Sequence, residues 1–564
     1  MKNVSNTIFR IKTSFNSPLG VRGLPLQGLG VLFFLFLFSS CKEPEVPTIV
    51  VVKNDETFSP AKVRPVLEEW QHKTFNYFWD GASPCGLALE GNNRNDGGVV
   101  TIGGSGFGLM AIIVGSERGW IIRTQAAERT QKIVRFLGKA ERFKGVWSHW
   151  YTPDGLSTPF GDQVKAGDLV ETSFMIAGLL TASEYYSANS TVETEIRDSV
   201  ASFWNTINWK FYAGTGTGLN WIWYSQENRL AFQFGGWNEA WICYIMALAA
   251  PSTHNISSDT YTQGWLNNNG IYNLNRSDYG YLLPLGEDKG GPLFFAQYSF
   301  LGLDPRKIED QSVNYWKQNV AHTMINRNYC LVEAPAIYKY DENNWGLTAC
   351  YGAKPPAWNY LARSPLNDDG VIAPTAALSS YPYTPFYSTQ VLLQLAKNTL
   401  VQGTYGFADA YCPQTNTSEK KELAIDQGPI VAMMENYRSG LIWNLMMKND
   451  HVKAGLLLAG VKDKPNYQQG FNLAVVNTVT HEFDMMRHPD REVFELNYVV
   501  SSAGNTAFKI TNSSNVLVID TTLNAIPGEN IFAFKSSKIL NGKQYTIKMI
   551  SPDSKEYQLV VRLR

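Results

Sequence analysis

The sequence predicts an all-α (α/α)6 toroid followed by a small all-β, immunoglobulin-like sandwich. Strongly apolar segments recur along the chain, each entered through a glycine-rich or acidic loop, and they alternate with amphipathic segments. Helices that are apolar all round are buried, whereas helices with a polar stripe face solvent, so this alternation favours an inner and an outer ring. Near residue 464 the pattern changes to short β-rich runs separated by turns such as Asn541-Gly542. An open helical array is the alternative to the closed ring.

The first 40 residues predict a lipoprotein signal peptide. Basic residues precede an apolar run from Val31 to Phe38, which is too short to span a bilayer. The segment from Leu37 to Cys41 resembles a bacterial lipobox, so Cys41 is the expected lipidation site. We therefore expect an outer-membrane lipoprotein that faces the periplasm or the cell surface, with residues 41–64 as a tether. A plain secretory signal followed by a chance cysteine is the alternative.

Residues 65–462 carry the helical pattern, and residues 465–564 carry the β pattern. A first helix is expected to start near Val66. The six expected inner helices begin near Gly104, Asp168, Gly235, Gly290, Thr389 and Asp426. The expected outer helices include Arg123–Arg142, Val192–Trp209 and Ile308–Ile325.

Composition narrows the possible functions. The chain has 564 residues and a net charge of −1, which gives no electrostatic reason to expect nucleic acid as a partner. Aromatic residues make up 13% of the chain and include 16 Trp, which suits a helical core and also suits stacking on sugars. There is no CxxC or HExxH spacing, so we expect no metal or other cofactor. We also expect a monomer. Cys330 and Cys350 could pair as a disulfide.

Four carboxylates lie at the starts of three expected inner helices. Asp168 and Glu171 are three residues apart, Glu239 precedes the third helix and Asp426 opens the last. In a toroid the ends of the inner helices line one open face, so these side chains are expected to converge. A structural role at a helix start, such as capping, is the alternative for each of the four carboxylates. The aromatic residues around the acids favour a site and are candidate substrate-binding residues: Trp147, His149, Trp150, Trp221, Trp223, Trp237 and Tyr411.

Paired carboxylates in an aromatic cleft are typical of glycoside hydrolysis. One acid must stay protonated to deliver a proton to the leaving oxygen. The other must be ionised, so that it can activate water or attack the anomeric carbon. Burial near tryptophan rings can raise the pKa of one carboxyl and so separate the two roles.

Several segments together resemble the glucoamylase-like glycoside hydrolases of bacteria, a group that includes the β-1,2-glucanases of family 144. The segments are DLVETSFMIAGLL, GWNEA, YGFADAYCPQ, IDQGPIVAMMENYRSGLIW and NDHVKAGLLLAG, and the resemblance covers roughly residues 66–460. It implies an (α/α)6 barrel and metal-free, inverting hydrolysis of β-1,2-glucan. It also implies a catalytic set of Asp168, Glu171, Glu239 and Asp426. We expect Glu239 as general acid and Asp426 as base, with Asp168 and Glu171 binding the sugar.

Several alternatives stay open at this stage. Arg438 can pair with Glu435 along its helix or reach a sugar hydroxyl, and His149 can line the sugar site or be a satisfied loop histidine. A polysaccharide lyase on the same toroid would need a Tyr or His base and cationic residues, whereas the motifs here are acidic. A non-catalytic glycan-binding surface lipoprotein would keep the aromatic residues without needing convergent acids. The sequence does not separate endo action from exo action that releases sophorose.

Overall fold

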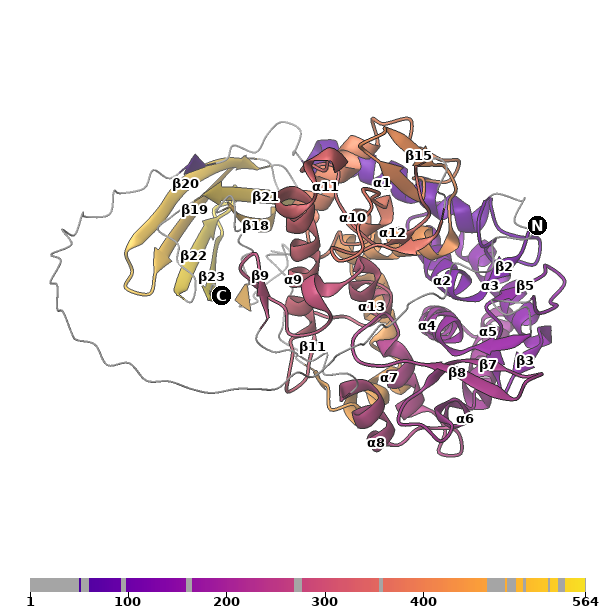
Figure 1. Ribbon diagram of the computed structural model, residues 1–564. Helices are drawn as coiled ribbons and strands as arrows, with labels where there is room; N and C mark the ends of the chain where they lie inside the picture. The colour runs from indigo at the N-terminus through magenta and orange to yellow at the C-terminus, as the bar shows by residue number, and fades with distance from the viewer. Residues whose placement is uncertain are drawn as a thin grey trace, which may run out of the picture.

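The computed structural model describes residues 50–51, 60–92, 98–158, 165–267, 276–354, 359–463, 482–483, 493–500, 504–525, 528–535 and 543–562. The predicted signal peptide, Cys41 and most of the predicted tether lie outside these ranges. Helices dominate the described residues up to position 463, and strands dominate the rest (Figure 1).

The α-helices of the first part are α1 (Pro60–Trp79), α2 (Ile102–Glu117), α3 (Arg123–Lys139), α4 (Leu169–Tyr185), α5 (Thr191–Thr206), α6 (Trp209–Ala213), α7 (Trp241–Ala249), α8 (Ser258–Tyr261), α9 (Tyr315–Asn328), α10 (Pro374–Leu378), α11 (Pro385–Leu395), α12 (Ala424–Arg438), α13 (Leu441–Met446) and α14 (Asp450–Leu458). Short strands connect them: β2 (Val100–Thr101), β3 (Arg142–Phe143), β4 (Val146–Trp147), β5 (Trp150–Tyr151), β6 (Ala166–Asp168), β7 (Asn220–Tyr224), β8 (Arg229–Gln233), β9 (Ser277–Asp278), β10 (Tyr281–Leu282), β11 (Ile308–Glu309), β12 (Ala349–Cys350), β13 (Leu361–Ala362), β14 (Ala410–Cys412), β15 (Thr417–Glu419) and β16 (Lys462–Asp463).

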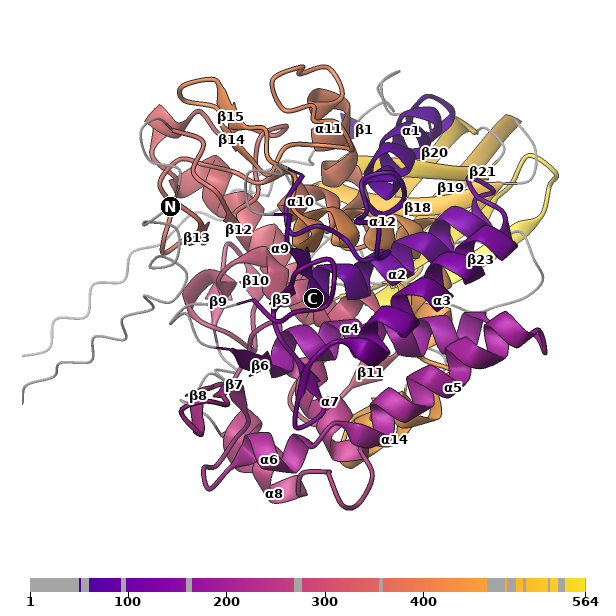
Figure 2. The same cartoon turned by 90° about the vertical axis from the view of Figure 1, so that its right-hand side faces the viewer.

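The helices form an inner and an outer layer. Helix α2 is buried along almost its whole length and packs against α4 and α12, which are also buried on nearly every side. Helices α3 and α5 pack against each other outside α2 and α4 (Figure 2). Both outer helices bury one apolar stripe and expose the opposite face, as their amphipathic sequences predict. This helix-rich part fits a helical toroid.

Two expectations for the fourth helical pair are wrong. The apolar segment after Gly290 forms 3-10 turns at Leu293–Ala296 and Ser299–Leu301 instead of an α-helix. Helix α9, expected to face solvent, is buried on nearly every side despite its polar residues. Some of its buried polar groups bond to other segments: Asn326, for example, exchanges hydrogen bonds with the backbone of Leu347 at 2.9 and 3.1 Å. Such partners from distant loops make a polar helix compatible with burial.

The C-terminal strands form two sheets. They are β17 (Glu482–Phe483), β18 (Val493–Val500), β19 (Gly504–Asn512), β20 (Leu517–Ala525), β21 (Gly528–Lys535), β22 (Gln544–Ile550) and β23 (Glu556–Arg562). One sheet has the order β17-β23-β22-β19-β20. The other has the order β1-β21-β18, in which β1 (Val50–Val51) pairs antiparallel with β21. A segment expected to be part of the tether therefore contributes an edge strand to the C-terminal part.

The five described cysteines are free thiols, so Cys330 and Cys350 are not paired. Instead, the Cys350 sulfur accepts a hydrogen bond of 3.3 Å from the guanidinium of Arg363, which is fully buried. Among the described residues, none of the helices combines the length and the hydropathy that crossing a bilayer requires.

Candidate active site

Asp168 and Glu171 lie side by side at the start of α4. Strand β6 ends at Asp168, which is the N-cap of α4 and accepts the Glu171 N–H at 3.0 Å. The expected capping bond therefore exists, but the Glu171 side chain does not close a capping box. It crosses to α2, where its Oε2 accepts the Gly103 N–H at 2.8 Å. A Cβ at position 103 would lie 2.2 Å from that oxygen, so only glycine allows this approach.

His149 joins this pair of acids. Its Nδ1 lies 2.8 Å from Asp168 Oδ2, and the imidazole side chain is 18% exposed. Burial lowers the pKa of His149, but Glu171 and Asp168 outweigh it and raise the pKa to about 9. Burial raises the pKa of Glu171 to about 7 against the opposing charge of His149. His149 is therefore a cation at neutral pH that fixes the Asp168 carboxylate, rather than a satisfied loop histidine remote from the site.

Glu239 lies in the turn directly before α7, whose first residue is Trp241. The Ser299 hydroxyl holds this turn, since it donates to the Glu239 carbonyl and accepts the Ile242 N–H at 3.0 Å. The Glu239 side chain is buried, and burial raises its pKa to about 7, with a further contribution from the nearby charge of Glu171. A carboxyl with this pKa keeps a proton available near neutral pH, as a general acid requires.

Asp426 lies in the first turn of α12, two residues after the helix begins at Ala424. Its side chain is 1% exposed, and burial together with the neighbouring Asp409 carboxyl raises its pKa well above the ordinary value. The Thr375 hydroxyl donates to the Asp426 carbonyl at 3.0 Å and fixes the helix start. Within the described part of the chain, no N–H or O–H group donates to either Asp426 carboxyl oxygen. Its carboxyl is therefore not used as a helix cap.

Four further residues belong to the site and were missed from the sequence. Tyr298 faces the carboxyl groups of Glu171, Glu239 and Asp426, which together with burial raise its pKa, so it stays a neutral donor. Its ring is fixed by stacking on Phe294, with centroids 5.3 Å apart. The other three are Glu90, Asp409 and Tyr360, whose charges or hydroxyls interact with the Asp426 carboxyl. All four come from loops or 3-10 turns, where no periodic pattern draws attention to them.

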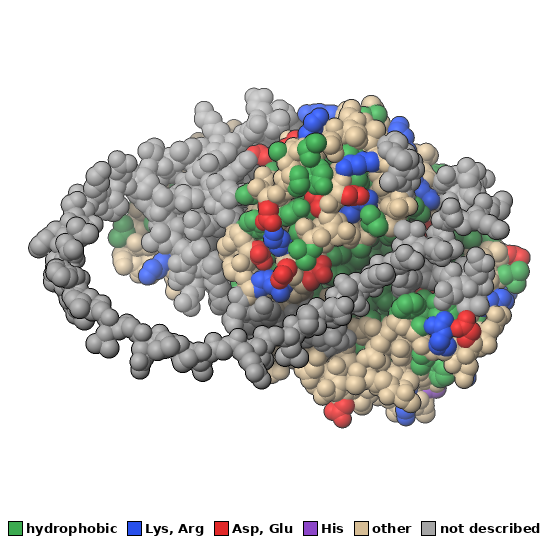
Figure 3. Space-filling view, viewed as in Figure 1, with side chains coloured by type: hydrophobic (Ala, Val, Ile, Leu, Met, Phe, Trp, Pro, Cys, Tyr) green, Lys and Arg blue, Asp and Glu red, His purple; other side chains and the backbone are tan. Residues whose placement is uncertain are grey.

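The expected aromatic residues divide into two groups. Trp150, Trp221 and Trp223 are partly exposed, and they remain candidates for sugar binding. Figure 3 shows hydrophobic side chains lining a hollow in the face of the helical part that is visible there. Trp147, Trp237 and Tyr411 are buried, and their binding to sugar stays a prediction. The Trp147 indole donates to the Leu137 carbonyl at 3.1 Å, and Trp237 stacks on Tyr315 with centroids 5.9 Å apart.

Arg438 lies away from Asp426 and binds residues of α1. It lies at the C-terminal end of α12, about 18 Å along the helix from Asp426 at about 1.5 Å per residue. Its guanidinium binds Glu68 and donates to Gln71 at 2.5 Å, both on α1. The pairing with Glu435 expected along the helix does not form either, because Glu435 pairs with Arg118 at 2.7 Å.

The chain matches known proteins by family model, sequence and structure. The family model Glycoamylase, described as "Putative glucoamylase", matches residues 231–450, which include Glu239 and Asp426. The endo-β-1,2-glucanase of Chitinophaga pinensis, solved with sophorotriose and glucose, is 43% identical. The match covers 71% of this chain and 98% of that one, with a TM-score of 0.66.

Two relatives from Parabacteroides distasonis extend the comparison. The crystal structure of a β-1,2-glucanase is 36% identical with a TM-score of 0.66, and the match covers 71% of this chain and 60% of that one. An exo β-1,2-glucooligosaccharide sophorohydrolase (non-reducing end) is 37% identical over 429 residues. That match covers 71% of this chain but only 58% of the sophorohydrolase. The chain belongs to the glucoamylase-like family of bacterial glycoside hydrolases, together with these β-1,2-glucanases.

Proposed function

We propose that the chain hydrolyses β-1,2-glucan by an inverting mechanism, with Glu239 as general acid and Asp426 as general base. The observation that carries this proposal is the set of buried carboxyl groups from α4, the turn before α7, and α12 around the neutral hydroxyl of Tyr298. Glu239 has a pKa of about 7 and no cationic partner among the causes of its shift, so it holds a proton. Asp168 and Glu171 then bind and orient the sugar.

The linkage and the stereochemistry have different support. The β-1,2 linkage comes from the relatives, whose names specify β-1,2-glucan or its oligosaccharides. Inversion follows from acids carried by separate elements, which leave room for a water between sugar and base. Carboxyl groups roughly 6.5–9.5 Å apart are typical of inverting enzymes. Endo cleavage and exo cleavage that releases sophorose both fit this arrangement.

The test is a panel of β-1,2-glucan, β-1,3-glucan, α-1,4-glucan and xylan, with reducing-sugar release and ultraviolet absorbance followed together. We expect reducing sugar from β-1,2-glucan alone, with the α-anomer appearing first by NMR. Initial appearance of the β-anomer would refute inversion, and activity only on another polymer would refute the linkage. An absorbing unsaturated product would instead indicate a lyase. Binding of β-1,2-glucan without any product would indicate a glycan-binding protein.

Three further proposals concern the whole chain. We propose that the helical part is an (α/α)6 barrel, supported by its alternation of buried and amphipathic helices. We propose that the C-terminal part is an immunoglobulin-like sandwich, supported by the edge-to-face contact of Tyr498 on β18 with Phe508 on β19, at 4.9 Å between centroids. Those two strands belong to different sheets.

We also propose that Cys41 is lipidated and anchors a monomeric protein to the outer membrane.

A further inference from the structure

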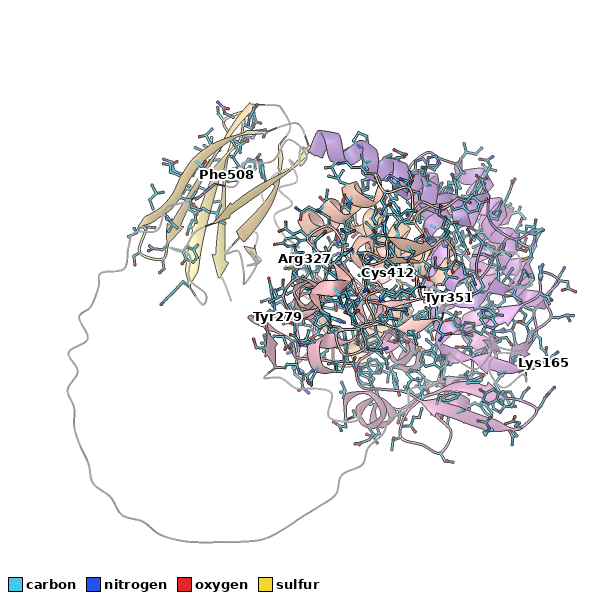
Figure 4. The ribbon with its side chains drawn as sticks, turned by 45° about the horizontal axis from the view of Figure 1, so that its top comes forward. Lys165, Tyr279, Arg327, Tyr351, Cys412 and Phe508 are labelled. Atoms are coloured by element: carbon cyan, nitrogen blue, oxygen red, sulfur yellow. The ribbon has the colours of Figure 1, made fainter. Side chains whose placement is uncertain are left out.

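A second buried aspartate, Asp409, lies beside Asp426 and takes no part in the acid–base pair proposed above. It precedes β14, where its N–H donates to the Lys421 carbonyl at 2.8 Å. Its Oδ2 accepts the Tyr351 N–H at 2.6 Å. Asp409 and Asp426 are each 1% exposed. Figure 4 places Tyr351, the residue whose backbone holds Asp409, within the helical part.

The two carboxyl groups are partners for each other. Each carboxyl acts on the pKa of the other, and both are buried in the same part of the site. Among the described residues, no N–H or O–H group from elsewhere donates to Asp409 Oδ1 or to either carboxyl oxygen of Asp426. Two carboxylates without water or donors between them repel strongly, and a hydrogen bond between them needs one proton. Burial and the lack of any other donor to these three oxygens therefore favour one protonated carboxyl in the pair.

The charges around the pair do not remove this preference. The cation that acts on Asp409 from the neighbouring elements is Arg363, which is already bound to Asp369 at 2.7 Å and to the Cys350 carbonyl at 2.6 Å. The other titratable groups that face the pair are either acidic or neutral at pH 7, and they are Glu90, Tyr298, Cys350, Tyr360 and Glu419. None of these five groups compensates a second negative charge.

We propose that Asp409 is a positioning residue that shares one proton with Asp426, so that the pair carries a single negative charge in the free enzyme. This inference rests on the proposed role of Asp426 as the base. During hydrolysis, water forms the new bond to the anomeric carbon and gives one proton to Asp426. The glycosidic bond breaks, and its oxygen takes the Glu239 proton. The shared proton stays on Asp409, and the pair later returns the extra proton to Glu239 through solvent.

The first experiment compares the pH dependence of kcat/KM for the wild type and Asp409→Asn on β-1,2-glucan. The amide that replaces the carboxyl has the same shape and can still donate to Asp426, but it no longer competes for a proton. Asp426 then ionises more easily, so we expect the acidic limb to move to lower pH by at least about one unit. Asp368→Asn is the matched control, since that carboxyl is also partly buried but bonds to Tyr329 and Tyr340 outside the pair. An unchanged acidic limb in Asp409→Asn would overturn the proposal.

The second experiment needs no activity. A carboxyl pair that keeps a proton in the folded state binds more protons than the unfolded chain above about pH 4, so folding stability falls as pH rises through that window. Asp409→Asn and Asp426→Asn should each flatten this fall in Tm between about pH 4 and 8, and the double variant should flatten it no further. Asp368→Asn combined with Asp426→Asn should be additive.

These results separate the two proposals. Additive effects of Asp409→Asn and Asp426→Asn on the slope of Tm against pH would overturn the shared proton, whatever the enzyme cleaves. The opposite outcome is a wild type that hydrolyses no β-glucan, together with single variants whose effects on the slope of Tm against pH are not additive. That outcome would overturn the proposed function and support the shared proton. Asp426→Asn examines the pair from the other side, should Asp409→Asn fail to fold.

Discussion

At the scale of single residues, burial gives each acid of the site its protonation state. Glu239 and Glu171 both have a pKa of about 7, yet only Glu171 lies beside a cation, His149. Lowering the pH protonates both, but the cation beside Glu171 stabilises its ionised form, whereas no cation is among the causes of the Glu239 shift. The two glutamates are thus suited to different roles, Glu239 to proton donation and Glu171 to binding sugar hydroxyls.

Glu239→Gln is expected to lower kcat by about 10²–10⁴-fold, the range that general acid catalysis contributes. The amide has the same shape and removes only the proton, so Tm should change little. In the wild type, kcat/KM should fall as pH rises through about 7, because Glu239 then loses its proton. Initial rates on β-1,2-glucan across this pH range measure both effects. Near-normal turnover by folded Glu239→Gln would remove this residue from the acid role.

Arg438 is expected to matter for stability and not for catalysis. Arg438→Met removes the charged hydrogen bonds to Glu68 and Gln71, which should destabilise the fold by about 1–3 kcal/mol. The long apolar side chain of Met keeps the packing of the arginine stem. Denaturant unfolding and kcat on β-1,2-glucan, measured in parallel, test this separation. A loss of kcat beyond tenfold with unchanged stability would return Arg438 to the substrate site.

The places of the four carboxylates in the fold could be predicted at this scale, but their surroundings could not. Asp168, Glu171 and Asp426 stand at helix starts, and Glu239 stands just before one, so the helical pattern alone selects them. Tyr298 and Asp409 carry no such pattern, because 3-10 turns and loops place side chains by contacts with distant segments. The burial of Trp147 and Trp237 could not be predicted for a related reason, since a tryptophan near an acid in sequence can still pack into the core.

At the scale of elements, α2 and α4 cross in close contact. Glu171 lies on α4 and bonds to Gly103 on α2. A Cβ at Gly178 would lie 2.1 Å from the Gly106 carbonyl oxygen, and a Cβ at Gly106 would lie 2.3 Å from the Phe174 carbonyl oxygen. The backbones therefore touch, which no other residue type allows. This close contact also brings the Gly103 N–H within reach of the Glu171 carboxylate.

Gly178→Ala is expected to destabilise the protein even though alanine is the better helix former. Its intrinsic helical preference contributes about 1 kcal/mol, but overpacking against backbone costs about 1–3 kcal/mol and cannot be relieved by a rotamer change. Gly138→Ala on α3 is the matched control, because its Cβ would meet only the Phe203 ring at 3.9 Å. We expect a lower Tm for Gly178→Ala and an equal or higher Tm for Gly138→Ala. Equal shifts in the two variants would contradict the close crossing.

The sequence predicted helix types correctly where a helix is rich in apolar residues. It did not do so where polar residues of a helix are covered by other segments. Helices α2 and α4 were identified because most of their residues are apolar, and α12 because of its apolar run from Ile430 to Met434. Helix α9 was placed outside, since its polar residues suggest solvent, whereas loops from the next segment cover them. The segment after Gly290 has helical composition, but Lys289, Gly290 and Gly291 all have positive φ, and its turns remain 3-10.

At the scale of the whole molecule, the N-terminal segment and the C-terminal sheets form one unit. Val50 and Val51 pair with Lys535 and Phe534 of β21, across almost the full length of the chain. None of the site residues named above comes from the C-terminal strands (Figure 1). Cys41 precedes Val50 by about nine residues, which reach at most about 30 Å when fully extended. A lipid on Cys41 would therefore hold the sheet that contains β1 within that reach of the membrane surface.

Two variants test this arrangement in cells. Cys41→Ala is expected to move the protein from the membrane fraction to the soluble fraction, because one cysteine carries the whole anchor, while specific activity on β-1,2-glucan stays the same. A chain that ends after Asp463 keeps the pairing of β16 with β11 and should stay in the membrane fraction, with kcat within about twofold of the full chain. Mass spectrometry of the N-terminal peptide reports the lipid directly. Wild-type protein found soluble with an unmodified Cys41 would refute the anchor, and an inactive but folded shorter chain would mean that the C-terminal sheets support the site.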